Sequence, residues 1–187
     1  MLDLKPTSLE GVVEIVPRKF DDERGFFSET YSAQALAEHG VDLVFRQDNH
    51  SYSEVSGVLR GLHYQLQPRA QAKLVRVVRG RIFDVAVDIR RGSPTLGKWV
   101  GLEISAEKWN QLLVPVGFAH GFVTLEPATE VVYKVTDYYS PEHDRSIRFD
   151  DPQIGIAWPF TADMVQLSPK DRDALPLAAA DLFDFDT

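Results

Sequence analysis

The sequence predicts an all-β domain, and three features support that fold class. Short β-prone runs follow one another from about residue 44 onward, separated by turn clusters such as RRGSPTLG and EPAT. Only one convincing helical segment interrupts the first half of the chain. With 187 residues, 44% of them hydrophobic, the chain can build one core. Many short strands at this spacing are typical of a β-sandwich or barrel, and we expect a single domain over residues 1–187.

The N-terminal part alternates between extended runs and turns. It comprises, in order, a β-prone run at residues 12–16, a charged turn at 19–25 and an extended run at 26–31. Ser32 can cap a short helix over residues 33–39, because its hydroxyl accepts a hydrogen bond from a free backbone N–H. Gly40 is placed to end that helix as a C′ glycine does.

Residues 73–89 carry the clearest strand pattern. Two apolar arms, KLVRVV and RIFDVAVDI, are joined by a tight turn at Arg79–Gly80. On the second arm, one face carries four apolar side chains and the other carries two aspartates: Phe83, Val85, Val87 and Ile89 against Asp84 and Asp88. We interpret the two arms as a β-hairpin.

The rest of the chain continues in short elements. Further strands are expected at residues 98–104, 110–114, 118–125 and 130–136. DDPQIGIAWP is typical of a loop and LSPKDRDA of a short helical turn, and from about residue 174 we expect a loose acidic tail.

Composition and charge exclude several functional classes. The absence of Cys excludes disulfides and thiolate metal sites, and it fits a reducing compartment. The N-terminus lacks the basic and apolar regions of a signal peptide, and no stretch approaches the roughly 20 apolar residues of a membrane span. A net charge of −8 argues against nucleic-acid binding. We therefore expect a cytoplasmic protein with neither membrane nor nucleic-acid partners.

The segment SGVLRGLHYQ at residues 56–65 is the strongest indication of a pocket. It brings Arg60 and His63 into an apolar, β-prone run, where a guanidinium and an imidazole are unusual. Gly57 and Gly61 leave room for a ligand or a second backbone to approach closely.

The motifs indicate no metal site, no catalytic nucleophile and no nucleotide-binding loop of a known type. The residue two positions after His63 is Gln65, and His50, His63 and His120 each stand alone on different segments. We expect His50 to cap a turn, and we expect no metal site. No G-x-S-x-G elbow, G-x-G-x-x-G or P-loop occurs in the sequence.

Proton transfer remains as the chemistry that these residues suit. An imidazole with an ordinary pKa near 6.5 can serve as a base at neutral pH, if a carboxylate holds its tautomer. Three carboxylates are candidates for this role: Asp171, Asp84 and Asp48. Tyr133 could supply a proton from another direction, and Lys73 could stabilise an oxyanion. Together they suit abstraction of a proton α to a carbonyl.

Six motifs in register resemble one family of sugar-nucleotide epimerases. The motifs are RGFFSETY, QDNHS, GVLRGLHYQ, AKLVRVVRGRIFDVAVDIRRGSPT, PVGFAHGFVTL and YKVTDYYSPEHDR. They resemble the dTDP-4-dehydrorhamnose 3,5-epimerases, and the similarity extends over about residues 11–173. The resemblance implies a cupin-type jelly roll, a β-sandwich or barrel with a few short peripheral helices.

The resemblance also implies a reaction and a partner. The expected substrate is dTDP-4-dehydro-6-deoxy-D-glucose, epimerised at C3 and C5 to dTDP-4-dehydro-L-rhamnose, with neither metal nor cofactor. The expected assembly is a homodimer in which exchanged N-terminal strands complete the partner's site.

Matching motifs imply the residue roles. His63 resembles the general base, Asp171 its orienting carboxylate, Tyr133 the general acid on the opposite ring face and Lys73 the group near the C4 oxygen. The implied substrate-binding set consists of Arg24, Glu29, Gln47, Asp48, Asn49, Arg60, His120, Tyr139, Asp144 and Lys170. Asp144 stands where relatives often have Glu, which shortens the reach of any contact there.

Three alternatives remain open on the sequence alone. Close relatives epimerise C3 only or C5 only and keep the same residue types. A sugar-nucleotide-binding cupin without turnover would not need both His63 and Tyr133. A metal-dependent cupin oxygenase or isomerase would need a stoichiometric metal.

Overall fold

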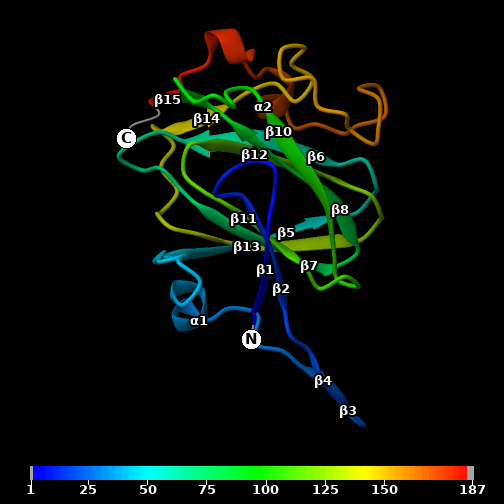
Figure 1. The fold of residues 1–187 in the computed structure, drawn as a ribbon. Helices are drawn as coiled ribbons and strands as arrows, with labels where there is room; N and C mark the ends of the chain where they lie inside the picture. Colours follow the sequence, from blue (N-terminus) through cyan, green and yellow to red (C-terminus); the bar gives the residue numbers. More distant parts are fainter. Residues whose placement is uncertain (1, 185–187) are drawn as a thin grey trace.

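A computed structural model describes residues 2–184, and eleven of their strands form two facing antiparallel β-sheets (Figure 1). The six-stranded sheet contains, in spatial order, β1 (Leu2–Pro6), β2 (Val13–Pro17), β11 (Gln111–Val114), β7 (Lys73–Arg79), β13 (Thr129–Val135) and β5 (Gln47–Ser53). The five-stranded sheet contains β10 (Trp99–Ser105), β8 (Arg81–Asp88), β12 (Phe118–Thr124), β6 (Leu59–Gln65) and β14 (Asp144–Ser146). This is the jelly roll that the sequence predicted.

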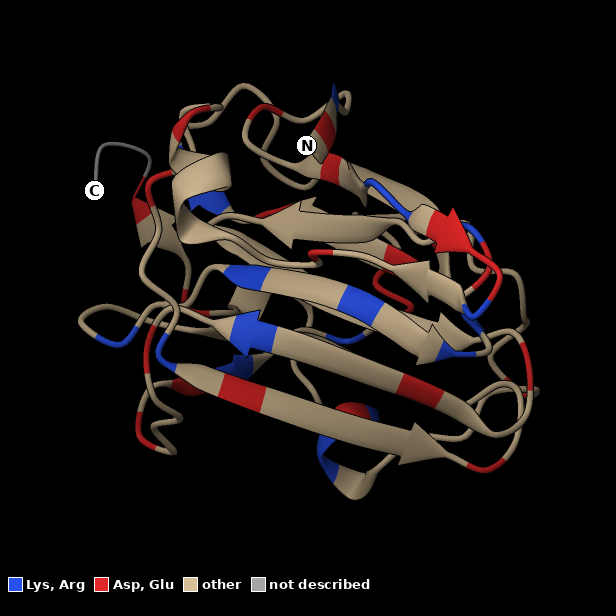
Figure 2. Ribbon diagram, turned by 90° about the horizontal axis from the view of Figure 1, so that it is seen from below, with Lys and Arg blue, Asp and Glu red and all other residues tan. Residues whose placement is uncertain are grey.

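The two sheets enclose the main hydrophobic core. Val75 and Val131 from the six-stranded sheet pack with Ile82, Ala86 and Phe122 from the five-stranded sheet. Val75, Ile82 and Ala86 are completely buried. Charged residues occupy isolated positions along the strands and gather in the connecting loops (Figure 2).

The arms of the predicted hairpin at residues 73–89 do not pair with each other. β7 bonds to β11 and β13, whereas β8 bonds to β10 and β12 in the other sheet. The chain changes sheets at Gly80, where φ is +78° and an added Cβ would lie 2.3 Å from Thr129 Oγ1. The hairpin interpretation is thus wrong, because the glycine forms a corner between sheets. Both faces of β8 are buried. One faces the core between the sheets, and the other faces the C-terminal segment.

The other predicted strands appear with shifts of one residue at most ends. The structure adds β1, which pairs antiparallel with β2 and was not predicted. Ser32 caps α1 (Ala33–Ala37), as expected, and accepts a hydrogen bond from the Ala35 N–H. Residues 19–31 contain a two-stranded arm, β3 (Phe20–Asp22) and β4 (Gly25–Phe27), rather than a turn followed by one extended run.

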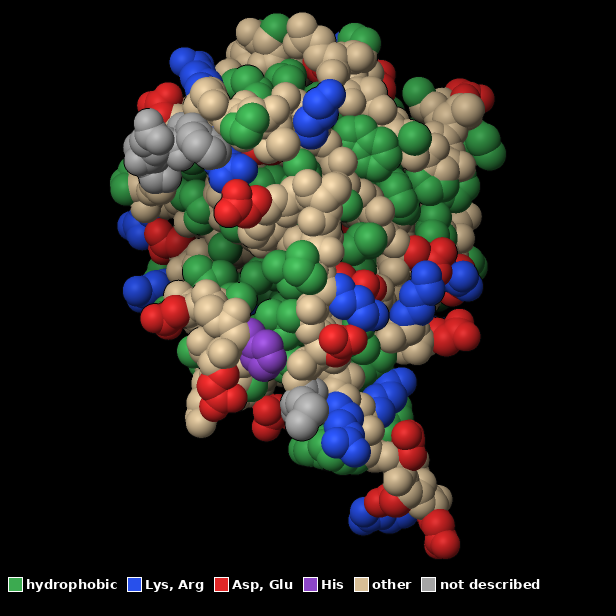
Figure 3. Space-filling model, viewed as in Figure 1, with side chains coloured by type: hydrophobic (Ala, Val, Ile, Leu, Met, Phe, Trp, Pro, Cys, Tyr) green, Lys and Arg blue, Asp and Glu red, His purple; other side chains and the backbone are tan. Residues whose placement is uncertain are grey.

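The β3–β4 arm projects from the body of the molecule (Figure 1). Its side chains include basic and acidic groups next to one another (Figure 3). It also exposes aromatic surface, since Phe27 is 69% exposed.

The C-terminal segment is packed rather than loose through Asp184. Ser168 caps the predicted helical turn, α2 (Pro169–Arg172), which is followed by a 3₁₀ turn, η1 (Leu177–Ala179). β15 (Phe183–Asp184) then pairs in parallel with β9 (Arg90–Arg91). Leu177 and Phe183 are buried against the outer face of the five-stranded sheet, which overturns the expected tail over this stretch. The last three residues of that expected tail lie outside the described residues.

Two glycines bring strands β6 and β12 into direct backbone contact. A Cβ on Gly61 would lie 2.5 Å from the Cα of Gly121, and a Cβ on Gly121 would lie 2.9 Å from the carbonyl oxygen of Arg60. Gly57 is similarly close to a second backbone, because its Cβ would lie 2.9 Å from the Met164 carbonyl oxygen. The expectation that Gly57 and Gly61 admit close approach is confirmed. Among the described residues, no helix is long and apolar enough to cross a membrane.

Candidate active site

A pocket with two lobes opens between the sheets. Three side chains line both lobes: His63 from β6, Lys73 from β7 and Tyr133 from β13. The rim lobe, about 210 Å³, is also lined by Gln47, Asn49, Tyr64, Gln65, Gln71, Tyr139, Asp144 and Lys170. The inner lobe, also about 210 Å³, is also lined by Ser51, Arg60, His120, Phe122, Ser168 and Asp171. Eleven of the fourteen predicted site residues therefore lie around one pocket.

A β-bulge explains why Arg60 and His63 both face the inner lobe. They are three positions apart, so regular alternation would put them on opposite faces of the sheet. The register between β6 and β12 shifts here, since Arg60 is opposite Phe122 while His63 is opposite His120. The bulge adds one residue to β6 between Arg60 and His63, so both side chains point to the same face of the sheet.

His63 is held by Asp171 through a short hydrogen bond between Nε2 and Oδ1. Of the three candidate carboxylates, Asp171 is the one that reaches this imidazole, and its side chain is only 4% exposed. Burial lowers the pKa of His63, although hydrogen bonding and attraction from Asp171 oppose the shift. The imidazole is therefore neutral at pH 7 and can accept a proton at the ring nitrogen that Asp171 leaves free.

Asp171 itself stays ionised. Burial alone would raise the pKa of Asp171, but hydrogen bonds from His63, Ser168 and the Gly61 backbone outweigh it and lower that pKa. The Ser168 hydroxyl donates to Asp171 Oδ2 over 2.8 Å. A charged carboxylate in this position stabilises the imidazolium that forms when His63 takes up a proton.

A second histidine–aspartate pair lies beside the first. His120 Nε2 is 2.6 Å from Asp84 Oδ1, and both side chains are buried. Asp84, another of the three candidates, thus holds His120 rather than His63. Its Oδ2 atom is buried without a hydrogen-bond partner among the described residues. Within residues 2–184, no group of three or more His, Asp or Glu side chains is arranged to hold a metal ion.

Lys73 lies next to His63. Its Nζ donates to the His63 carbonyl oxygen over 3.0 Å, and the residue is 7% exposed. Burial lowers the pKa of Lys73 to about 8, against the opposing attraction of Asp144 and Asp84. The ammonium is mostly charged at pH 7, so it can stabilise an oxyanion in a poorly hydrated site.

Tyr133 faces His63 from the opposite sheet. It lies on β13 of the six-stranded sheet, whereas His63 lies on β6 of the five-stranded sheet. Burial raises the pKa of Tyr133, and the negative charge of Asp144 adds to the shift while Arg60 opposes it. The phenol therefore keeps its proton at neutral pH and can donate it.

Hydrogen bonds fix the rim lobe. The Gln47 side-chain oxygen accepts from the Tyr139 N–H over 3.1 Å, and the Gln65 side-chain oxygen accepts from the Ser140 N–H over 2.8 Å. Gln65 thus anchors the rim loop. Asp144 Oδ2 accepts from Lys170 Nζ and, over 3.3 Å, from the Tyr139 hydroxyl, which ties β14 to α2 across the mouth of the pocket.

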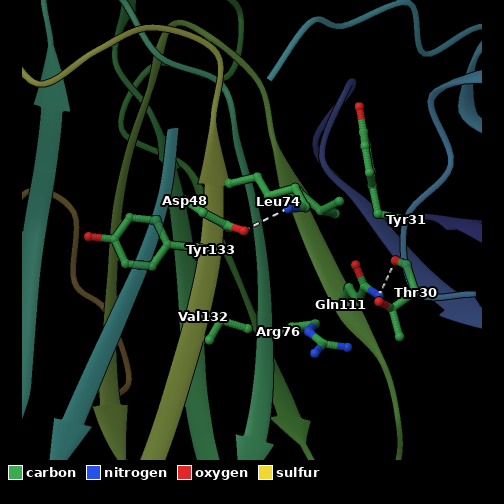
Figure 4. Close-up of a pocket in the computed structure, with 9 residues that line it drawn as sticks. Thr30, Tyr31, Asp48, Leu74, Arg76, Gln111, Val132 and Tyr133 are labelled. Atoms are coloured by element: carbon green, nitrogen blue, oxygen red, sulfur yellow. Dashed lines mark hydrogen bonds and ion pairs between the residues drawn. The ribbon is translucent and has the colours of Figure 1, made fainter. Parts of the chain in front are cut away.

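Asp48 lies on the other face of the sheet from this pocket. Its side chain accepts from Lys134 Nζ over 2.8 Å and lines a separate depression of about 180 Å³ on the outer face. Figure 4 shows Asp48 and Tyr133 pointing in opposite directions. Alternation along β5 explains the split, because it directs Gln47 and Asn49 inward and their neighbours outward. His50 also points outward, where it contacts Glu130 Oε2 at 3.0 Å; it lies within a strand and does not cap a turn.

Arg24 and Glu29 are the other predicted site residues that line neither lobe. Arg24 lies in the turn between β3 and β4, with its side chain 89% exposed and paired with Asp22. Glu29 is exposed shortly after β4. Within one chain, the arm and the pocket remain separate.

Several lining residues were not singled out from the sequence. One of them, Gln71, lies in none of the family motifs. Two others, Ser51 and Phe122, lie within such motifs, but nothing in the sequence marked them as site residues. Ser168 could have been found, because Ser three positions before an acidic residue at a predicted helix start is a capping signal.

Comparisons with known proteins agree with this geometry. A family model described as dTDP-4-dehydrorhamnose 3,5-epimerase matches residues 6–179. The Pseudomonas aeruginosa dTDP-4-dehydrorhamnose 3,5-epimerase is 51% identical over 177 residues, 94% of this chain and 96% of that one. The crystal structure of a Legionella pneumophila dTDP-6-deoxy-D-glucose-3,5-epimerase, in complex with dTDP-4-keto-L-rhamnose, matches with a TM-score of 0.94 at 47% identity and covers 99% of both chains. A Streptomyces niveus dTDP-4-dehydrorhamnose 3-epimerase is 39% identical over 178 residues, 95% of this chain and 84% of that one.

Proposed function

The chain belongs to the dTDP-4-dehydrorhamnose 3,5-epimerase family, and we propose that it converts dTDP-4-dehydro-6-deoxy-D-glucose into dTDP-4-dehydro-L-rhamnose at the two-lobed pocket. It is an isomerase, as its relatives are named. The observation that carries the proposed site is the placement of His63 and Tyr133 on opposite sheets, with Lys73 lining both lobes beside them. A base and an acid across a sugar ring are what inversion at carbon requires.

The first step is removal of a proton from carbon. The C4 ketone acidifies the hydrogens on C3 and C5, so the free nitrogen of His63 takes one of them as a proton. The electrons of the broken C–H bond form an enolate whose negative charge lies largely on the C4 oxygen. The Lys73 ammonium stabilises that charge.

The second step is protonation of the same carbon from the other side. The Tyr133 hydroxyl gives its proton to the face opposite His63, so the new C–H bond inverts the centre. The imidazolium proton and the phenolate then re-equilibrate with water before the second carbon reacts. Because the ketone lies between C3 and C5, one base and one acid can serve both carbons.

The experiment that tests this proposal is turnover of the 4-keto sugar nucleotide in heavy water. The expected product carries deuterium at both C3 and C5, since each new C–H bond takes its hydrogen from an exchangeable phenol. Mass spectrometry and proton NMR of the product locate the label. Label at C3 alone or C5 alone would establish a single epimerase, and binding without any label would establish a non-catalytic sugar-nucleotide-binding protein.

The proposed functional unit is a homodimer whose N-terminal arms complete the partner's pocket. Support comes from the projecting β3–β4 arm, which carries Arg24 and exposed aromatic rings away from its own pocket. An arginine is well suited to the diphosphate of the nucleotide. Each protomer is proposed to be one domain over residues 1–187, and the Cys-free sequence supports a cytoplasmic location.

Subunit mixing can test whether the arm crosses to the partner. We expect the double variant Arg24→Ala/Glu29→Ala and the variant His63→Ala each to be nearly inactive alone. If arms are exchanged, co-expressed hybrid dimers contain one site with an intact arm and an intact base, and random mixing restores about a quarter of wild-type activity. If each arm serves its own chain, every hybrid site lacks one component, and activity stays at the level of the parents.

A further inference from the structure

Ser168 connects the cap of α2 to the carboxylate of the proposed catalytic pair. Its Oγ accepts from the Asp171 N–H over 3.1 Å and donates to Asp171 Oδ2 over 2.8 Å. In a capping box, the acidic residue at this helix position would bond back to the backbone N–H of the cap residue. Here Asp171 Oδ1 is directed at His63 instead. The Ser168 hydroxyl therefore both donates a hydrogen bond to Asp171 and accepts one from it.

From this geometry we infer that Ser168 is a positioning residue for epimerisation: its hydroxyl fixes the Asp171 carboxylate in the orientation that holds His63. The inference rests on the proposed function of His63 as the base. The fixed carboxylate has two anchors, Ser168 at Oδ2 and the Gly61 backbone. α2 is four residues long, which is too short to hold its own shape without such contacts.

The side chains around His63 determine what else could move its titration. The charged and titratable groups that line the pocket with it come from six elements and one loop: Arg60 and Tyr64 of β6, Lys73 of β7, His120 of β12, Tyr133 of β13, Asp144 of β14, Lys170 and Asp171 of α2, and Tyr139 of the loop before β14. Among the groups named here, the Ser168 hydroxyl has a described hydrogen bond with Asp171 alone, so removing it changes one of these groups directly.

The test compares three variants at this position. Ser168→Ala and Ser168→Gly remove the hydroxyl, and glycine is the milder change for the cap. Both are expected to lower kcat for epimerisation roughly tenfold with KM little changed. This is at the low end of the effect of losing a hydrogen bond to a charged group, because Ser168 is exposed. Ser168→Thr keeps the hydroxyl and is expected to restore kcat.

The pH profile separates orientation from stability. A carboxylate free to rotate stabilises the imidazolium less, so the acid limb of kcat should move to lower pH in the alanine and glycine variants. A general loss of folding stability would lower kcat by the same factor at every pH and would leave the acid limb in place. Ser32→Ala is the matched control, because Ser32 caps α1 with the same kind of bond and lines neither lobe.

Two results would overturn the inference. One is an alanine or glycine variant with wild-type kcat; the other is an acid limb that stays in place or moves to higher pH. Either outcome would leave the proposed function intact as long as the wild-type protein epimerises its substrate and His63→Ala does not. Thermal unfolding of each variant shows that the measured protein is folded.

Discussion

Replacing His63 with alanine is expected to abolish epimerisation almost completely. The imidazole is the group that Asp171 holds at the junction of both lobes, and burial keeps it neutral near pH 7. General base catalysis contributes on the order of 10²–10⁴ in rate. Among the described residues, His63 is the imidazole that hydrogen-bonds to Asp171. Exchange of the C3 and C5 hydrogens with heavy water should be lost together with product formation.

Nucleotide affinity serves as the internal control for His63→Ala. Calorimetry with dTDP should give nearly the wild-type affinity, since the residue proposed to bind the diphosphate is Arg24 and not His63. His50→Ala is a matched histidine control, because His50 points to the outer face of β5 and pairs with Glu130. Substantial hydrogen exchange in His63→Ala would show that another group removes the proton.

Replacing Tyr133 with phenylalanine should separate the two halves of the reaction. The ring and its packing remain, but the half-buried phenol proposed to donate the proton is gone. Product formation is expected to fall by roughly 10²-fold or more, while proton removal from carbon falls much less. The measurement compares loss of deuterium from substrate labelled at C3 or C5 with the rate of product formation.

Tyr52→Phe provides the control for the loss of a tyrosine hydroxyl. Tyr52 lies on the outward face of β5 and is 53% exposed, so its hydroxyl does not enter the pocket. A fully active Tyr133→Phe variant would refute the assignment of the acid. Equal losses of exchange and turnover would instead place Tyr133 in the proton-removal step.

Local patterns predicted most strands but could not predict how they pair. Residues 73–89 show the limit: the alternation and the glycine were interpreted correctly as strands and a turn, yet β7 and β8 belong to different sheets. Their real neighbours are far along the chain, at β10 to β13, and no local signal identifies them. The packed C-terminal segment was missed for the same reason, since Leu177 and Phe183 find their apolar partners only in the folded sheet.

The sequence predicted which residues belong to the candidate site more reliably than which of them contact one another. Residue chemistry alone left three carboxylates open for His63. The family resemblance implied Asp171, 108 residues away in sequence, and the fold brings its carboxylate to the imidazole. Asp48 illustrates a signal that was present but unused. It lies between Gln47 and Asn49 on a strand, so period-two alternation already places its side chain opposite theirs.

The contact between Gly61 and Gly121 limits how this enzyme can be redesigned. Main-chain atoms alone set the spacing between the two strands that present His63 and His120, so no shorter side chain exists that would widen the pocket wall at that point. Any larger residue there would push the two imidazoles apart. Altered sugar preference has to be sought where side chains can be trimmed, at Tyr139, Gln47 and Asn49 of the entrance.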